Sequence, residues 1–308
     1  MMHVNKDNLQ HQGLLNGIGQ IYFTPSIVAS VLVVFAISIE SFLLALLTLL
    51  GACCSYTLAR YNYASHKTNS RIIHHLNSGM YTLNGALIAL FIGNFFGVTP
   101  LLALVTVFGA LITVPVANFV FRFRKYRGYT SAFIFTAWLI YAIQSSLELS
   151  FFSPPDTATI PLIDIDVDSS ALLPTFLVLA LKGISQVCFV NNEWAGLIIL
   201  IAIMINGTKH AIWIVLAAVI STLFSYFIGA DEKLITQGLY GYNAVLTTLA
   251  LILYPRIAWP LVFMAILLSC LITLIFHRLE WVTLTAPFIL STWLMVFLSD
   301  KLNNSKSD

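Results

Sequence analysis

Two glutamines stand in apolar surroundings at matching places in this chain. Gln20 closes the run Gly17–Gln20, and Gln186 closes the similar run Gly183–Gln186. A buried amide without hydrogen-bond partners costs roughly several kcal/mol, so such a group persists only where something binds to it. Hydrogen bonding between membrane helices is the ordinary explanation. The matched positions favour a second one, in which the amides bind a solute that has shed its water.

Two threonines recur in the same manner. Thr130 and Thr285 each begin a Thr-x-x-Phe run. A single threonine in a membrane helix usually bonds to its own backbone, but a matched pair near an axis can face each other across a pore. Phe23, Phe189 and Tyr242 lie beside the repeated polar groups. Aromatic side chains are most often packing residues, and here the alternative is that they form the flat walls of a slot.

The repetition extends along the whole chain. The run Gly79–Asn84 returns as Gly238–Asn243, between the glutamine and threonine motifs of each half. Three motifs therefore occur twice in the same order, which indicates two homologous halves. Apolar residues make up 59% of the chain and charged residues 9%, against a globular norm of roughly 25% charged. The sequence predicts an all-α membrane protein, and repeated membrane halves suggest a transport path at their interface.

Five membrane elements are expected in each half. They lie near residues 20–37, 41–59, 79–94, 99–121 and 130–148, and near 187–205, 211–229, 238–254, 257–276 and 284–299. The predicted organisation is a cytoplasmic N-terminal tail (1–12), a first repeat (13–149), an external acidic linker (150–178), a second repeat (179–299) and a cytoplasmic C-terminal tail (300–308). No cleavable signal peptide is evident, because the first 25 residues hold no uninterrupted apolar core.

The basic residues predict the topology. With the N-terminus inside, twelve of them fall on the cytoplasmic side: Lys6, Arg60, Lys67, Arg71, Arg122, Arg124, Lys125, Arg127, Lys209, Arg256, Lys301 and Lys306. Lys182, Lys233 and Arg278 fall outside. This is a strong positive-inside bias. Five crossings per half is an odd number, so the second repeat must enter the membrane from the opposite side, and the repeats are predicted to be inverted.

Two short, glycine-punctuated segments are aligned between the halves, Gly79–Gly93 and Gly238–Tyr254. Such segments often begin near the bilayer midplane as half-helices, whose free backbone groups need partners in a pore or on a neighbouring helix. Tight helix packing would explain a single glycine. The matched pair, with Asn84 and Asn243 in register, favours half-helices that meet near the midplane and line the path.

Ionisable groups are scarce in the predicted path. Glu193 is the single carboxylate near a pore motif, and no paired acids or His–Asp relay lies within the spans. Coupled transporters often carry such groups, so the pattern favours passive passage of a neutral solute. The cysteines at 53, 54, 188 and 270 lack metal-ligand spacing and are expected to be buried apolar residues. We expect no cofactor, no metal, no enzymatic activity and no nucleic-acid partner.

The repeated motifs resemble those of the urea transporter family. The run Gly183–Asn192 is similar to the family's pore motif, Gly238–Asn243 to its second motif and Leu284–Phe288 to its third, and the resemblance covers roughly residues 13–299. It implies a homotrimer in the cell (inner) membrane, with a pore through each protomer. It also implies facilitated, channel-like passage of urea through a narrow slot, with aromatic rings at both end sites and hydrogen-bond acceptors along one side.

The resemblance also implies roles for individual residues. By position, Gln20 and Gln186 belong to the inner and outer sites, Phe23 and Phe189 to the constriction, and the threonines to the centre. The full expected pore-lining set is Gln20, Phe23, Leu83, Leu87, Thr130, Gln186, Val187, Phe189, Tyr242, Leu246 and Thr285.

The first half departs from the family pattern. Leu83 stands where a second aromatic ring is usual, Ala132 replaces the proline that Pro287 keeps, and Thr24–Ser26 replaces the paired asparagines of the second half. Because of Leu83, a channel of the same fold that conducts another small neutral amide is an alternative function. An ion-coupled secondary transporter is a further alternative, and a membrane enzyme such as an amidohydrolase is the least supported, since no metal cluster or nucleophile–base pair is visible.

Overall fold

The computed structural model describes residues 12–65, 70–123, 127–147, 175–254 and 257–304, and these segments are helical with no strand among them. The chain divides into two compact units, residues 1–168 and 169–308. The predicted linker falls almost entirely on residues 148–174, and the predicted N-terminal tail on 1–11, outside the described residues.

The first unit begins with two short elements, α2 (Gln12–Gly17) and the 3₁₀ turn η1 (Gly19–Tyr22). Six further helices follow: α3 (Ile27–Glu40), α4 (Phe42–Ser65), α5 (Ser70–Asn77), α6 (Met80–Phe96), α7 (Pro100–Val120) and α8 (Ser131–Leu147). The first predicted element, 20–37, is therefore interrupted. Pro25 and the N-cap Ser26, whose side chain accepts a hydrogen bond from Ala29 N, start α3 anew.

The second unit follows the same order. It contains α9 (Thr175–Ser185), the 3₁₀ turn η3 (Gln186–Cys188), α10 (Glu193–Asn206), α11 (Thr208–Phe227), α12 (Glu232–Thr236), α13 (Gly241–Ile252), α14 (Trp259–Arg278) and α15 (Ala286–Asn304). The predicted element 187–205 is interrupted here too: the chain bends by 77° between the α9–η3 segment and α10. Asn192 caps α10 by accepting hydrogen bonds from Trp194 N and Ala195 N.

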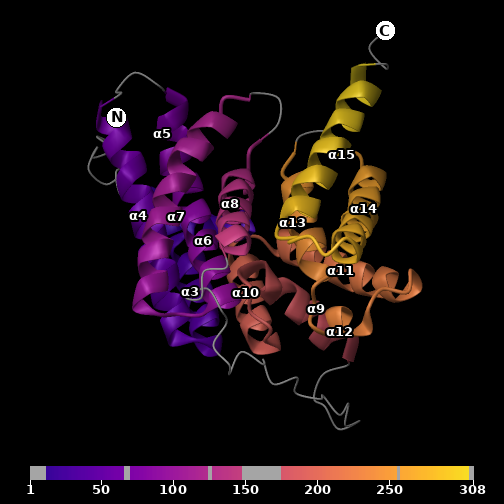
Figure 1. Ribbon diagram of the computed structural model, residues 1–308. Coiled ribbons are helices and arrows are strands. Elements are labelled where there is room, and N and C mark those ends of the chain that lie inside the picture. The colour runs from indigo at the N-terminus through magenta and orange to yellow at the C-terminus, as the bar shows by residue number, and fades with distance from the viewer. Residues whose placement is uncertain (1–11, 66–69, 124–126, 148–174, 255–256, 305–308) are drawn as a thin grey trace. The chain divides into compact units, whose positions relative to one another are not determined.

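One short helix lies at the centre of each unit. In the first, α6 packs against α4 and α7, and in the second, α13 packs against α11 and α14 (Figure 1). All residues of α13 from Gly241 to Leu251 are buried. A helix that is apolar on every side is buried on every side. These are the two segments predicted from their glycines as central half-helices.

Small residues let the central helix of the first unit approach its neighbour. A Cβ added at Gly85 on α6 would lie 2.4 Å from the carbonyl oxygen of Gly51 on α4. Packing through small residues is typical of membrane helices, where lipid supplies no hydrophobic driving force for association.

Four helices are long and apolar enough to cross a membrane, or five if the bent pair α9–η3 and α10 counts as one span, among the described residues. The four are Phe42–Tyr63 of α4, α7, α11 and α14; α3, α6, α8 and α13 are shorter apolar helices. The prediction that some of the ten elements would fall short of full spans is consistent with these lengths.

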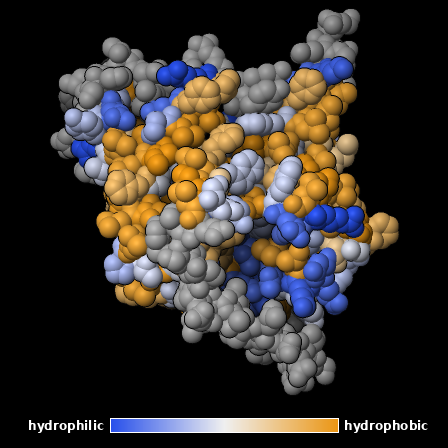
Figure 2. All heavy atoms as spheres, in the orientation of Figure 1, coloured by the Kyte–Doolittle hydropathy of each residue, from blue (hydrophilic) through white to orange (hydrophobic). Residues whose placement is uncertain are grey.

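The helices carry large hydrophobic side chains on their outer surfaces. On α7, Leu104, Phe108 and Phe119 are each more than half exposed, and Figure 2 shows hydrophobic residues spread over the visible surface of the helices. Contiguous exposed apolar surface of this extent suits contact with lipid or with another membrane protein. Cys53 is exposed and Cys54 is partly so, whereas Cys188 and Cys270 are buried. The prediction of burial was therefore wrong for Cys53, because it lies on an outward face of α4.

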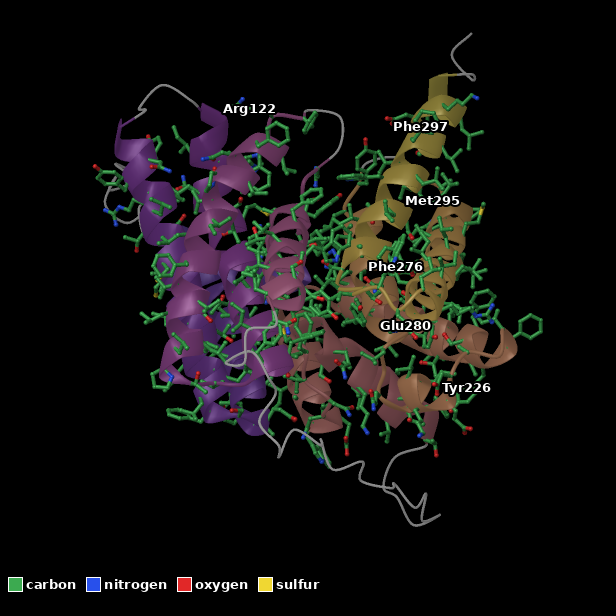
Figure 3. All side chains as sticks on the ribbon, viewed as in Figure 1. Arg122, Tyr226, Phe276, Glu280, Met295 and Phe297 are labelled. Carbon is green, nitrogen blue, oxygen red and sulfur yellow. The ribbon has the colours of Figure 1, made fainter. Side chains whose placement is uncertain are left out.

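The turn between α14 and α15 leads into the third motif of the second unit. Phe276 and Glu280 lie at the end of α14 from which this turn leaves (Figure 3). The Phe276 ring meets Trp281 edge-on, with 5.5 Å between centroids. Glu280 adopts a left-handed backbone conformation with φ 56°. The turn thus brings the chain back to α15 through Leu284 and Thr285.

Candidate functional site

The predicted glutamine motifs fold into the same sharp turn in both units. Each 3₁₀ turn ends on a phenylalanine in the left-handed region, Phe23 with φ 55° and ψ 25°, and Phe189 with φ 59° and ψ 26°. Non-glycine residues seldom adopt this conformation, which costs about 1–3 kcal/mol unless the surroundings enforce it. Both phenylalanines are partly exposed. The same strained turn in both units makes these turns candidates for a functional site.

The threonine motifs carry a second matched pair of strained residues. Tyr129, before Thr130, and Leu284, before Thr285, both have φ 44°. Five non-glycine residues have positive φ in the part of the chain that the structure describes, and four of them belong to these two pairs. Strain of this kind gathers at binding and active sites, because it aims side chains that a relaxed backbone would not.

The asparagines at the central helices fasten these threonine turns. Asn84 accepts a hydrogen bond from Phe133 N at 2.8 Å, and its amide nitrogen donates to Tyr129 O at 3.4 Å and Met80 O at 2.7 Å. Asn84 is fully buried. The side chain therefore serves the backbone of its own unit, and its role is to hold the turn rather than to face a solute.

Asn243 repeats that role in the second unit. It accepts a hydrogen bond from Phe288 N at 3.2 Å and donates to Leu284 O at 3.3 Å. It also lies 3.4 Å from the hydroxyl of Thr273 on α14. The free N–H groups at the start of α8 and α15 thus find partners on the neighbouring central helix, as helix ends require.

The side chains of the two glutamines have different hydrogen-bond partners. The Gln186 amide nitrogen donates to Gln237 O at 2.9 Å. The Gln20 amide nitrogen is 3.7 Å from Met80 Sδ, and its Oε1 is buried with no hydrogen-bond partner in the structure. An unsatisfied buried amide oxygen costs about 1–3 kcal/mol. Gln20 Oε1 thus differs from the Gln186 side chain, whose amide nitrogen is bonded to the backbone of its own unit.

The aromatic residues divide between the units. In the first, the rings of Phe23 and Tyr129 meet edge-on, with 5.6 Å between centroids and 64° between planes. In the second, the Tyr242 hydroxyl donates to Leu284 O at 2.6 Å. In each unit an aromatic side chain therefore contacts the residue that precedes the threonine. Phe23 contacts the ring of Tyr129 in the first unit, and Tyr242 contacts the backbone of Leu284 in the second.

The remaining predicted residues form buried apolar and hydroxyl groups. Thr130 and Thr285 are 4% and 2% exposed. Buried in the same way are the expected wall residues Leu83, Leu87, Val187 and Leu246. Gln20, Phe23, Gln186 and Phe189 are the partly exposed members of the predicted set.

Glycines bring the glutamine and central-helix motifs into contact within each unit. Gly79 (φ 79°) and Gly238 (φ 76°) precede the central helices. A Cβ at Gly79 would lie 2.5 Å from Gly17 Cα, and one at Gly238 would lie 2.6 Å from Gly183 N. Both positions need glycine twice, for the left-handed conformation and for the close backbone approach.

The capping role of two residues and the position of a third were not expected from the sequence. Ser26 and Asn192 stand at matching places and cap α3 and α10, so the first half keeps the capping function of the second with a different residue. Tyr129 was missed because it lies outside the repeated letters. Its position directly before Thr130 was the one available signal. Lys182, predicted to lie outside, is buried in α9.

An all-helical protein with membrane-length apolar helices and two copies of one set of turns belongs to the class of repeat-built membrane transport proteins. One family model, described as "Urea transporter", matches residues 11–176 and matches again at 177–308. The chain therefore belongs to the urea transporter family. The double match confirms the predicted two-repeat organisation, and membership of a family of transporters agrees with the prediction that the chain is not an enzyme.

Curated relatives carry the same name. "Urea transporter 1" of Ovis aries is 38% identical over 74 residues, which cover 24% of this chain and 19% of the relative. "Urea transporter 1" of Mus musculus is 34% identical over 76 residues, 25% of this chain and 20% of the relative. The corresponding protein of Rattus norvegicus is 39% identical over 66 residues, 21% and 17% respectively. The aligned stretch spans about a fifth of the length of the curated relatives it matches.

Proposed function

We propose that this protein conducts urea across a membrane passively, through a narrow pore formed by its two repeats. The observation that carries the proposal is the family match to both halves. It is supported by matching strained turns that hold Gln20, Thr130, Gln186 and Thr285 beside aromatic and leucine side chains.

The chemistry of these groups suits a flat, neutral solute with N–H donors. Urea entering a slot loses water from each polar atom, and each hydrogen bond not replaced costs about 1–3 kcal/mol. Gln20 Oε1 is a buried acceptor without a protein partner. The carbonyl of Gln186 and the threonine hydroxyls continue the series in this proposal. Leu87, Val187 and Leu246 give an ion nothing to replace its water with, so ions are rejected.

Binding must be weak for flux to be fast. At each position the solute contacts an aromatic or leucine wall and a single hydrogen-bond acceptor. This contact offsets the loss of water on entry, but it keeps binding weak enough for release. We assign the expected pore-lining residues on this basis, with the asparagines outside the set because their amides bind the backbone.

The arrangement in the membrane belongs to the same proposal. Both termini lie in the cytoplasm, the two repeats are inverted, and the protein forms a homotrimer in the cell (inner) membrane. The charge distribution between loops supports the orientation, and the exposed apolar faces of helices such as α7 are suited to lipid and to protomer contacts.

Flux through purified protein in liposomes tests the function. Stopped-flow measurement of urea entry should show a permeability well above that of empty liposomes, unchanged by a proton or sodium gradient. Acetamide, tested alongside, should enter more slowly. Faster entry of acetamide than of urea would indicate a channel for another small amide. Accumulation of urea driven by an ion gradient would indicate an ion-coupled transporter.

A further inference from the structure

We propose that Tyr129 supplies the aromatic wall of the solute site in the first repeat, in place of the ring missing at Leu83. The inference rests on the proposed function and names a specificity-determining residue for it. Tyr129 lies on the turn before α8, not on the central helix that carries Tyr242 in the second repeat.

Comparison of the two units shows an exchange between two positions. Leu83 on α6 corresponds to Tyr242 on α13, because each follows the matched glycine by four residues. Tyr129 corresponds to Leu284, because each directly precedes the matched threonine and has φ 44°. Each unit therefore has one tyrosine and one leucine at these positions, in opposite order.

In both units the central helix is hydrogen-bonded to the residue that precedes the threonine. In the second unit, the Tyr242 hydroxyl reaches Leu284 O at 2.6 Å. In the first, the amide of Asn84, the neighbour of Leu83, reaches Tyr129 O at 3.4 Å. Positions 83 and 129 therefore lie on two segments that are bonded to each other, and an exchange that keeps one tyrosine and one leucine conserves the total side-chain volume.

The Tyr129 ring contacts a residue of the expected pore-lining set. It meets the ring of Phe23 at 5.6 Å between centroids, edge-on. Phe23 ends the turn that carries Gln20, and Thr130 is the next residue after Tyr129. Tyr129 is 5% exposed, so it is held in place rather than free in solvent. Tyr129 is thus close to three expected pore residues of the first repeat. It contacts Phe23, it is bonded in the chain to Thr130, and Gln20 lies on the turn that Phe23 ends.

The strained backbone explains how a loop residue can take this position. A left-handed φ at residue 129 reverses the direction of the chain just before α8, and Asn84 holds the turn by its carbonyl. Aromatic faces bind flat solutes with little loss of side-chain entropy. The first repeat therefore keeps a flat wall for urea although Leu83 is aliphatic.

The test is urea entry into liposomes that contain Y129L, Y129F or the exchange variant L83Y/Y129L. We expect Y129L to raise the half-saturating urea concentration by about fivefold or more, since a lost aromatic contact of about 1 kcal/mol corresponds to that factor. Y129F should stay within twofold of the wild type. The exchange variant should regain most of the loss, because it copies the order of the second repeat. Y141L, on the outer face of α8, is the matched control.

The outcomes separate the two proposals. Wild-type protein that conducts no urea removes the proposed function and this inference with it. Wild-type conduction together with an unchanged half-saturating concentration in Y129L overturns the inference alone, as does a loss in Y129L that the exchange variant fails to repair. If Y129L does not fold, Y129M takes its place, and wild-type behaviour of Y129M overturns the inference.

Discussion

The side-chain oxygen of Asn84 binds the backbone nitrogen of Phe133 at 2.8 Å, and joins the central helix α6 to the first turn of α8. The same bond joins Asn243 to Phe288 in the second unit. Each repeat therefore fixes its threonine turn to its central helix by a buried amide, and the position of the proposed acceptors depends on that bond.

Replacing Asn84 with alanine should destabilise the protein. The substitution leaves the buried Phe133 N–H without an acceptor, which costs about 1–3 kcal/mol, and frees the turn that holds Tyr129 and Thr130. We expect a clear fall in the thermal unfolding midpoint in detergent and a loss of urea flux. Asn94, exposed on the same helix and bonded to Leu90 O of its own turn, gives the control N94A. Equal midpoints for the two variants would contradict the anchoring role.

The threonine hydroxyls are tested by valine, which keeps the side-chain shape. The double variant T130V/T285V should assemble normally and conduct urea several-fold more slowly, because two replacement hydrogen bonds are lost. T113V is the matched control: Thr113 is also buried, and its hydroxyl bonds to Ala110 O within its own helix. Wild-type flux in the double variant would remove both hydroxyls from the path.

Alanine at Gly79 should disrupt the first unit. The new Cβ would lie 2.5 Å from Gly17 Cα, at a φ of 79°, so strain adds to a backbone clash that no side chain can relieve. The control is G229A. Gly229 also has a left-handed φ, 66°, but a Cβ there meets nothing within 4 Å. We expect G229A to cost about 1–2 kcal/mol and G79A to cost more, measured by thermal unfolding. A G79A midpoint equal to that of G229A would show that the clash is absent.

The proposed orientation is tested by labelling single cysteines in intact cells. Arg122 follows α7 and is predicted to be cytoplasmic, while Lys233 on α12 is exposed and predicted to be external. In a background with Cys53 and Cys54 replaced by alanine, a membrane-impermeant maleimide should label K233C in whole cells. It should label R122C only after the membrane is opened. Labelling of both in intact cells would overturn the predicted topology.

Comparison with the structure shows where repetition was informative. Gln20 with Gln186, and Gly79 with Gly238, were identified from the sequence because identical residues recur, and each pair has the same backbone conformation in both units. Ser26 and Asn192 were matched by position in the sequence, but their substitution was interpreted as a departure from the family pattern and the capping role that they share was not foreseen. They differ in type, yet both cap a helix, since a hydroxyl and an amide oxygen bind the same free N–H groups. A comparison of letters cannot find a function that two different side chains share.

The sequence alone determined the class of this protein. Its apolar composition, the motifs given twice in one order and their match to a family are local properties of the chain, and they required no coordinates. The tertiary structure decided which polar groups are bonded within the protein. Asn84 and Asn243 proved to be committed to the backbone, Gln20 Oε1 was left without a partner, and Tyr129 came to lie against Phe23. The physical reason is that hydrogen bonding and ring contact depend on residues that are distant in the chain and meet only when the helices pack.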